Sequence, residues 1–337
     1  MNVDTIQTQI KKIDENSLAQ AKELLLKGEL VAFPTETVYG LGADARSDAA
    51  VESIYRVKGR PSDNPLIVHV HKSFDISTLV TDIRPYVREL WSAFLPGPLT
   101  LVYTSRGTVS KKVSCGLDTL AVRVPSHPGA QEFLRYVNIP IAAPSANISK
   151  HVSPVSAEHV YADLGGGIPL ILDGGRCTGG IESTVCDVTG PYPRILREGL
   201  VSREMIEEVV GRCDVYVPKE GEKVRSPGMK YKHYAPRCET KLFAKDEISS
   251  AGEYLKQSEK AGRRTAVLCE SSVAQYFPNT QIFDLGKTDF EMAANLYGLL
   301  RQAEQTVDVL VAVCPKKEDG VMAGVLNRLK KACAVNK

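Results

Sequence analysis

LIVHV, residues 66–70, is a short apolar run that predicts a buried β-strand. Similar runs recur along the first two-thirds of the chain, namely ELVAF (29–33), LTLVY (99–103), TLAVRV (119–124), IPIAA (139–143), IPLIL (168–172), STVCDV (183–188) and RILRE (194–198). Helical patterns separate several of them, at 17–28, 48–57, 82–94 and 202–211. Such strands suit a sheet that helices cover on at least one face. The sequence therefore predicts an α/β domain, although periodicity does not fix its strand order.

A second unit follows a change in composition. Residues 217–238 are rich in Pro, Gly, Lys and Arg, which is typical of an extended linker. Beyond them, helix and strand patterns alternate to the end, which predicts a small parallel-sheet domain. A chain of 337 residues also exceeds the usual size of one core. We therefore expect domains at 1–216 and 239–337, joined by the linker at 217–238.

Composition excludes several classes of protein. With 43% hydrophobic and 24% charged residues and a net charge of +2, extensive disorder and a dedicated nucleic-acid binder are both disfavoured. The eight cysteines form no C-x-x-C pair, and His69 and His71 have no third ligand nearby in sequence, so a metal site in the protein is not expected. The polar start and the absence of a run near ~20 apolar residues predict a cytoplasmic protein without a membrane span.

PTETVYGLGADA (34–45) contains the pattern G-x-G-x-x-A. A dinucleotide-binding loop is disfavoured because PTETVY separates the first glycine from the preceding strand, and no acidic residue closes LIVHV. In one interpretation the glycines only permit a turn; in the other, which we favour, the residues before them bind a ligand. Thr35, Glu36 and Thr37 would present polar groups at the carboxyl end of a strand, where open α/β sheets bind ligands.

KGRPSDNP (58–65) places two cations in a loop that Pro61 and Pro65 stiffen. Surface cations are usually solvated, but cations ordered in advance at a strand edge suit a phosphate-rich ligand. The Walker A pattern G-x-x-x-x-G-K-[ST] is absent from the chain. The loop therefore predicts a different scheme of nucleotide binding through Lys58 and Arg60.

Further polar residues lie at the ends of other predicted strands. In TLAVRV, Thr119 and Arg123 share one face, and a buried arginine requires an anion such as a substrate carboxylate. Hydroxyl-bearing loops and one more cation follow, at Ser145, Asn147, Ser149, Ser153, Ser183, Thr184 and Arg197. No Ser/His/Asp or Cys/His set is evident. Cations and hydroxyls around strand ends favour phosphoryl or nucleotidyl transfer, where positioning and charge stabilisation dominate.

Taken together, these motifs resemble the YrdC-type threonylcarbamoyl-AMP synthases in their longer two-domain form. The resemblance rests on PTETVYGLGADA, KGRPSDNPLIVHV, PGPLTLV, VRVPSHP, PIAAPSANIS, STV, REG and SPGMKYKHYAP, in that order over residues 34–236. It implies a twisted mixed sheet with a concave basic cavity, a linker across that cavity, and a smaller Rossmann-like α/β domain at the C-terminus. It also implies that L-threonine, bicarbonate and ATP give threonylcarbamoyl-AMP and pyrophosphate.

The resemblance carries roles onto particular residues. It implies a threonine site at Thr37, His69, Arg123, Ala143 and Ser183. It implies a nucleotide site at Lys58, Arg60, Asn64, Thr119, Ser145, Ser153, Arg197 and Tyr234. Lys58 and Arg60 would be the catalytic cations, Mg²⁺ would accompany ATP, and the product would pass to the machinery that transfers threonylcarbamoyl to tRNA. Direct contact with tRNA is left open.

Two other functions compete with this interpretation. The first domain could hold double-stranded RNA or a nucleotide without catalysis, although the near-neutral charge and the lack of a continuous basic stripe count against that. A dinucleotide-dependent oxidoreductase would rest on GLGADA alone, in an unfavourable context.

Overall fold

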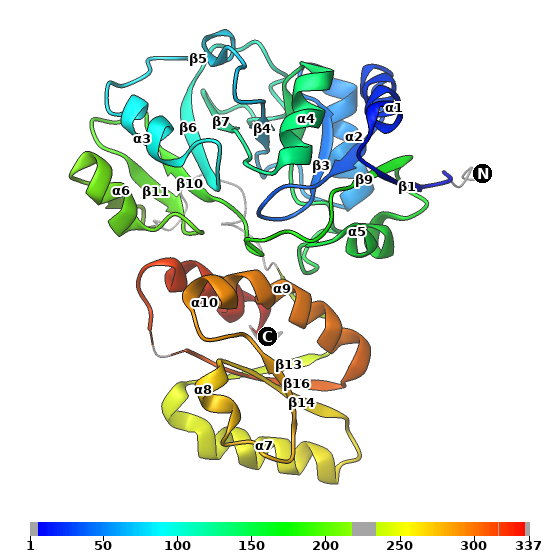
Figure 1. Cartoon of the computed structure of the whole chain (residues 1–337), viewed down its shortest axis with the longest axis vertical. Coiled ribbons are helices and arrows are strands. Elements are labelled where there is room, and N and C mark those ends of the chain that lie inside the picture. Colours follow the sequence, from blue (N-terminus) through cyan, green and yellow to red (C-terminus); the bar gives the residue numbers. More distant parts are fainter. Residues whose placement is uncertain (1–5, 218–233, 316, 334–337) are drawn as a thin grey trace.

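The computed structural model describes residues 6–217, 234–315 and 317–333. Within these residues the chain folds into two α/β units (Figure 1). The N-terminal elements are β1 (Gln9–Lys12), α1 (Glu15–Leu26), β2 (Val31–Phe33), β3 (Gly40–Asp44), α2 (Asp48–Lys58), β4 (Ile67–His69), β5 (Val80–Thr81), α3 (Val87–Phe94), β6 (Leu99–Ser105), β7 (Thr119–Arg123), α4 (Pro128–Val137), β8 (Ile141–Ala143), α5 (Ala157–Leu164), β9 (Leu170–Asp173), β10 (Thr184–Asp187), β11 (Arg194–Arg197), α6 (Arg203–Val210) and β12 (Asp214–Val215).

The N-terminal strands form one twisted, mixed sheet. Among the described residues it has twelve strands in the order β1-β9-β2-β3-β8-β4-β7-β6-β10-β11-β12, with β5 paired to β6. The sheet contains parallel pairs, such as β4 with β7, and antiparallel pairs, such as β4 with β8. The predicted α/β class and mixed sheet are confirmed.

The C-terminal unit has a parallel sheet of four described strands in the order β13-β16-β14-β15. Its elements are β13 (Glu239–Phe243), α7 (Ile248–Lys260), β14 (Thr265–Cys269), α8 (Ser271–Ala274), β15 (Gln281–Asp284), α9 (Asp289–Thr306), β16 (Val309–Val313) and α10 (Val321–Ala332). Helices α9 and α10 lie between this sheet and the N-terminal unit, whereas α7 lies on the far side (Figure 1). Most of the predicted linker falls outside the described residues, so its bounds stay predictions.

The interpretation in which the glycines of GLGADA only permit a turn is wrong. Gly40 and Gly42 lie in β3, which pairs antiparallel with β2. A Cβ atom at Gly42 would approach Ile141 Cγ2 to 2.9 Å, and one at Gly40 would approach Phe33 Cζ to 3.0 Å. The glycines are therefore required because a larger residue would clash with these side chains, and not because the chain turns here. The chain reverses before them, at residues 34–39.

Buried apolar residues form a core inside each unit and between the two units. The largest cluster continues from strands of the large sheet into α9 and α10. A smaller cluster joins α1 to α4, and another lies between α7 and the far face of the small sheet. No described helix is both long enough and apolar enough to cross a bilayer.

Candidate active site

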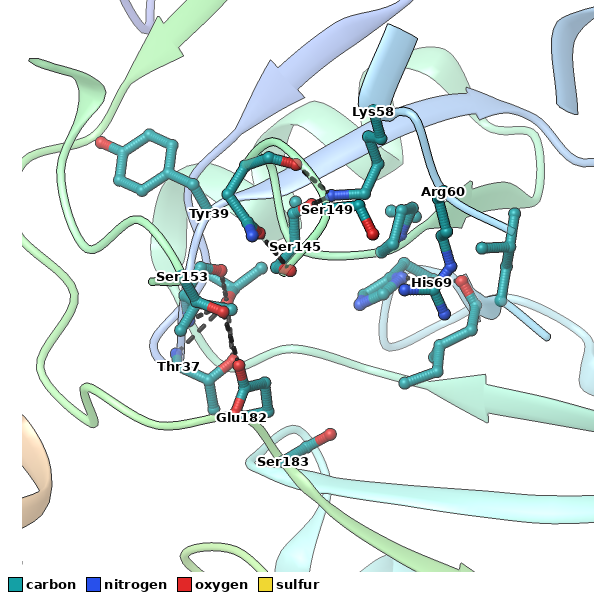
Figure 2. Close-up of a pocket in the computed structure, with 18 of the residues that line it drawn as sticks. Thr37, Tyr39, Lys58, Arg60, His69, Ser145, Ser149, Ser153, Glu182 and Ser183 are labelled. Atoms are coloured by element: carbon teal, nitrogen blue, oxygen red, sulfur yellow. Dashed lines mark hydrogen bonds between the residues drawn. The ribbon is translucent and has the colours of Figure 1, made fainter. Parts of the chain in front are cut away.

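A cavity opens beside the reversal between β2 and β3. Its empty volume is about 750 Å³, part of which is open to solvent. Its walls come from the end of α2, strands β4, β7 and β8, and the loop at 143–153 (Figure 2). Eleven of the predicted site residues line it, namely Thr37, Lys58, Arg60, His69, Arg123, Ala143, Ser145, Ser153, Ser183, Arg197 and Tyr234.

Lys58 is the last residue of α2 and is buried, with 2% of its surface exposed. Gly59 then ends the helix in the left-handed conformation. The Lys58 ammonium donates to the carbonyl of Ser145 at 2.5 Å and to that of Asn147. Burial, followed by the charge of Arg60, lowers the pKa of Lys58 well below its usual value. Because its partners are neutral carbonyls, a buried ammonium here favours an incoming anion.

Arg60 lies beside Lys58 in the stiff loop. Its Nη2 donates to the carbonyl of Pro65 at 3.3 Å and, at 3.4 Å, to that of Asn64. Burial lowers the pKa of Arg60. Among the described residues neither Lys58 nor Arg60 forms an ion pair with a carboxylate, and Arg60 Nε makes no hydrogen bond. These two cations are therefore available to phosphates.

Arg197 brings a third cation from the end of β11. Its Nη2 donates to the carbonyl of Ser183 at 2.9 Å and to the Ser183 hydroxyl at 3.3 Å. The Ser183 hydroxyl also lies 2.8 Å from that of Thr100. Burial, and then the charge of Arg328, lowers the pKa of Arg197. Hydroxyl and cation thus share one wall of the cavity.

His69 and Arg123 are cross-strand neighbours on the parallel pair β4 and β7. Burial and the charge of Arg123 lower the pKa of His69 to about 3, so its imidazole is neutral at physiological pH. Arg123 Nη2 lies 2.8 Å from Glu36 Oε1, but within the described residues neither Glu36 oxygen makes a hydrogen bond. A buried guanidinium with imperfect pairing suits recognition of a carboxylate.

The serine-rich loop is held in shape by its own side chains. The Ser145 hydroxyl donates to the side-chain oxygen Oδ1 of Asn147 at 2.5 Å, and the Asn147 side-chain amide donates to the carbonyls of Ile148 and His151. Ser153, at the other end of the loop, donates to Glu182 Oε1 at 2.6 Å (Figure 2). The loop therefore presents hydroxyls to the cavity in a defined arrangement.

Two of the predicted nucleotide residues do not line the cavity. Asn64 is buried, and its side-chain amide makes no hydrogen bond within the described residues. Thr119 starts β7, at the opposite end from Arg123, and is partly exposed. Their nucleotide roles stay predictions.

Glu182 was one of three carboxylates, with Glu36 and Asp63, that the sequence offered as possible groups near magnesium without choosing between them. It lines the cavity next to Ser183 and is buried, with 8% of its surface exposed. Burial would raise its pKa, but Arg328, Arg197 and Ser153 outweigh that effect and lower it to about 2. The local sequence GGIESTV gave no sign of these distant cations, which the fold alone brings to the carboxylate.

Comparison with known proteins agrees with this geometry. A family model described as "Telomere recombination", of the Sua5, YciO and YrdC group, matches residues 23–199. A second, described as the C-terminal domain of threonylcarbamoyl-AMP synthase, matches residues 201–334. Both halves of the chain therefore match domains of one architecture.

Relatives match over nearly the full length. A threonylcarbamoyl-AMP synthase of Pyrococcus abyssi is 40% identical, over 96% of this chain and 95% of its own. The Bacillus subtilis enzyme of the same name is also 40% identical, over 95% and 93%. The crystal structure of P. abyssi Sua5 complexed with L-threonine superposes with a TM-score of 0.88, covering 97% of each chain. The chain belongs to the two-domain threonylcarbamoyl-AMP synthase family.

Proposed function

We propose that this protein condenses L-threonine, bicarbonate and ATP to threonylcarbamoyl-AMP and pyrophosphate, as a cytoplasmic nucleotidyltransferase that supplies tRNA modification. The observation that carries the proposal is the pair of neighbouring cations, the buried Lys58 and the partly buried Arg60, whose partners are carbonyl oxygens rather than carboxylates. They face the same cavity as Arg123. One cavity thus offers charge to a triphosphate and to an amino-acid carboxylate.

The reaction divides into two steps. The amine of threonine adds to the carbon of bicarbonate and water leaves, which gives a carbamate. A carbamate oxygen then attacks the α-phosphorus of ATP, and the bond to pyrophosphate breaks. Neither step requires a covalent bond to the protein, so alignment, exclusion of water and neutralisation of charge are the tasks left to the site.

Each wall has a task in this scheme. Arg123 holds the threonine carboxylate, and neutral His69 can donate or accept a hydrogen bond without adding charge. Lys58, Arg60 and Arg197 stabilise the negative charge that shifts onto the phosphates. The L-threonine bound to the P. abyssi relative supports the amino-acid half of this assignment.

Magnesium enters as part of the substrate, bound to the phosphates of ATP. Within the described residues no group of three or more His, Cys, Asp or Glu is arranged to hold a metal ion. Glu182 lines the cavity, but Ser153, Tyr297 and Arg328 already occupy its oxygens. Magnesium usually binds such sites through phosphates and water, with few protein ligands. A cavity lined by cations and hydroxyls rather than by free carboxylates therefore fits ATP that carries its own magnesium.

The test follows pyrophosphate release from Mg-ATP and bicarbonate with threonine, serine, valine or no amino acid. Valine is isosteric with threonine but lacks the hydroxyl, and serine lacks the methyl group. We expect release to require bicarbonate and to be fastest with threonine, together with a labile adenylate product. Release that is independent of threonine would overturn the proposal.

A further inference from the structure

The C-terminal unit approaches the cavity through glycine contacts. A Cβ atom at Gly180 would lie 2.2 Å from the Ala293 carbonyl oxygen of α9. One at Gly324 of α10 would lie 3.1 Å from Gly199 Cα. Gly180 and Gly199 flank the segment that carries Glu182 and Ser183, and Figure 1 shows α9 and α10 on this side of the N-terminal unit. The two helices therefore pack directly on the backbone of the cavity wall.

Two side chains from these helices meet the Glu182 carboxylate. The Tyr297 hydroxyl, from α9, donates to Glu182 Oε2 at 2.8 Å. Arg328 Nε, from α10, donates to the same oxygen at 3.1 Å. The other oxygen, Oε1, accepts from Ser153 at 2.6 Å. Glu182 is thus a bridge between the C-terminal unit and a hydroxyl of the cavity.

The same two side chains contact the aromatic wall of the cavity. The Tyr234 ring stacks on that of Tyr297, with ring centroids 5.3 Å apart and planes at 27°. The Arg328 guanidinium lies 5.9 Å from the centre of the Tyr234 ring. Tyr297 and Arg328 are both fully buried, which restricts their motion. Tyr234 therefore has a rigid surface behind it.

We propose that Tyr297 and Arg328 are positioning residues of the nucleotide site, which fix Ser153 through Glu182 and fix Tyr234 by stacking. Neither residue lines the cavity, so both act through groups that do. This inference rests on the proposed function, because it deepens the account of the ATP site. It gives the C-terminal unit a defined task, namely to complete one wall of that site.

The arrangement differs from a contact that only joins two units. A hydrogen bond to an ionised carboxylate is stronger than one between neutral groups, and one carboxylate here links three donors. Loss of the Tyr297 hydroxyl would leave Glu182 with one donor fewer on the side opposite Ser153. We expect the Ser153 hydroxyl to lose its fixed orientation as a result.

The central variant is Tyr297→Phe in the full-length protein, because it removes one hydroxyl and keeps the ring that stacks on Tyr234. We expect the KM for ATP to rise about tenfold, the effect typical of losing a hydrogen bond to a charged group, while the KM for threonine stays unchanged. The matched control is Tyr254→Phe, which removes the 2.5 Å hydrogen bond from Tyr254 to Glu239 inside the C-terminal unit. It should leave both constants unchanged.

A double-mutant cycle tests the route through Ser153. If Tyr297 acts on ATP through Ser153, Tyr297→Phe should have a smaller effect on the KM for ATP in a Ser153→Ala background than in the wild type. Arg328→Lys should retain more ATP affinity than Arg328→Met, because it keeps a cation beside Glu182. Thermal denaturation shows whether each variant is folded.

The outcomes separate this inference from the proposed function. Wild-type protein that releases no threonine-dependent pyrophosphate contradicts the proposed function itself. An active wild type together with a Tyr297→Phe variant of unchanged KM for ATP overturns only the positioning role. The positioning role is also overturned if Tyr297→Phe raises the KM for ATP equally with and without Ser153→Ala. The same holds if Tyr297→Phe raises the KM for ATP and the KM for threonine equally.

Discussion

Lys58 in the cavity and Arg301 at the interface between the two units are both buried, with 2% and 3% of their surfaces exposed. Arg301 has a carboxylate partner, since its Nη2 and Nη1 lie 2.8 and 3.2 Å from the two oxygens of Asp163. Lys58 has only carbonyl partners. Burial without a counter-charge costs stability, so a protein that retains such a cation gains something else from it. Whether a buried cation has a carboxylate partner, more than how deeply it is buried, therefore distinguishes a structural cation from one that is available to a ligand.

The largest expected effect is on stability, at the paired cation. Arg301→Met would leave Asp163 buried with its main counter-charge removed, and breaking such a pair costs about 3–5 kcal/mol. Chemical denaturation should measure this loss. Arg264→Met is the control, because it removes an exposed ion pair with Asp308 and should change stability little. If the two variants lose the same stability, the pairing of Arg301 has no structural value.

Lys58→Met should separate activity from stability. We expect kcat/KM for ATP to fall by roughly 10²–10³, as when a charge-stabilising donor is removed. Stability should not fall and can rise, since the substitution removes a desolvated cation. Lys12→Met is the matched control, because Lys12 is exposed and pairs with Asp173. A Lys58→Met variant that loses stability but keeps its kcat/KM would contradict this assignment.

Arg123 lies between the two kinds of cation, since Glu36 is close to it but makes no hydrogen bond with it. If Glu36 competes with the substrate carboxylate, Glu36→Gln should lower the KM for threonine by threefold to tenfold, roughly 1 kcal/mol. The KM for ATP should stay unchanged. Glu132→Gln, an exposed substitution on α4, is the control. A higher KM for threonine would instead mean that Glu36 orients Arg123 for binding.

The sequence predicted those parts of the fold that depend on local pattern. The apolar runs at 66–70, 99–103 and 119–124 became β4, β6 and β7 of the large sheet. Strand β3 was missed because GLGAD carries two glycines, which usually indicate a turn. What decides their conformation is close packing against Phe33 and Ile141, and that contact is invisible in the local sequence.

The cavity residues also divide into those that local sequence predicts and those that only the packing of distant segments brings together. Motif residues such as Lys58 and Arg60 stand close together in the chain and were predicted together. Arg328 was not predicted as part of the site, because it is 146 residues from Glu182 in the chain. Its helix also contains LNRLKK, a sequence typical of a solvated basic face. Its burial depends on the packing of α10 against Gly199, which a local pattern cannot report.

The smallest expected effect concerns pH, at His151. Its Nδ1 lies 2.9 Å from Asp163 Oδ1 and its Nε2 lies 2.7 Å from Glu304 Oε2, so both nitrogens face carboxylates. Burial and the nearby Arg301 lower the pKa of His151, but its hydrogen bonds to the two carboxylates outweigh them and raise it above the usual value.

Because the pKa of His151 is raised in the folded state, its contribution to stability is complete below the unfolded pKa and is lost as pH rises through the folded pKa. The melting temperature should therefore contain a component that falls as pH rises above the unfolded pKa of histidine, about 6.5. Glu304→Gln should flatten this component, since it removes one of the two carboxylates. The loss should stay below that of Arg301→Met, because neutral His151 keeps one hydrogen bond. An identical pH profile in Glu304→Gln would show that the pairing of His151 with Glu304 contributes nothing to the docking of the two units.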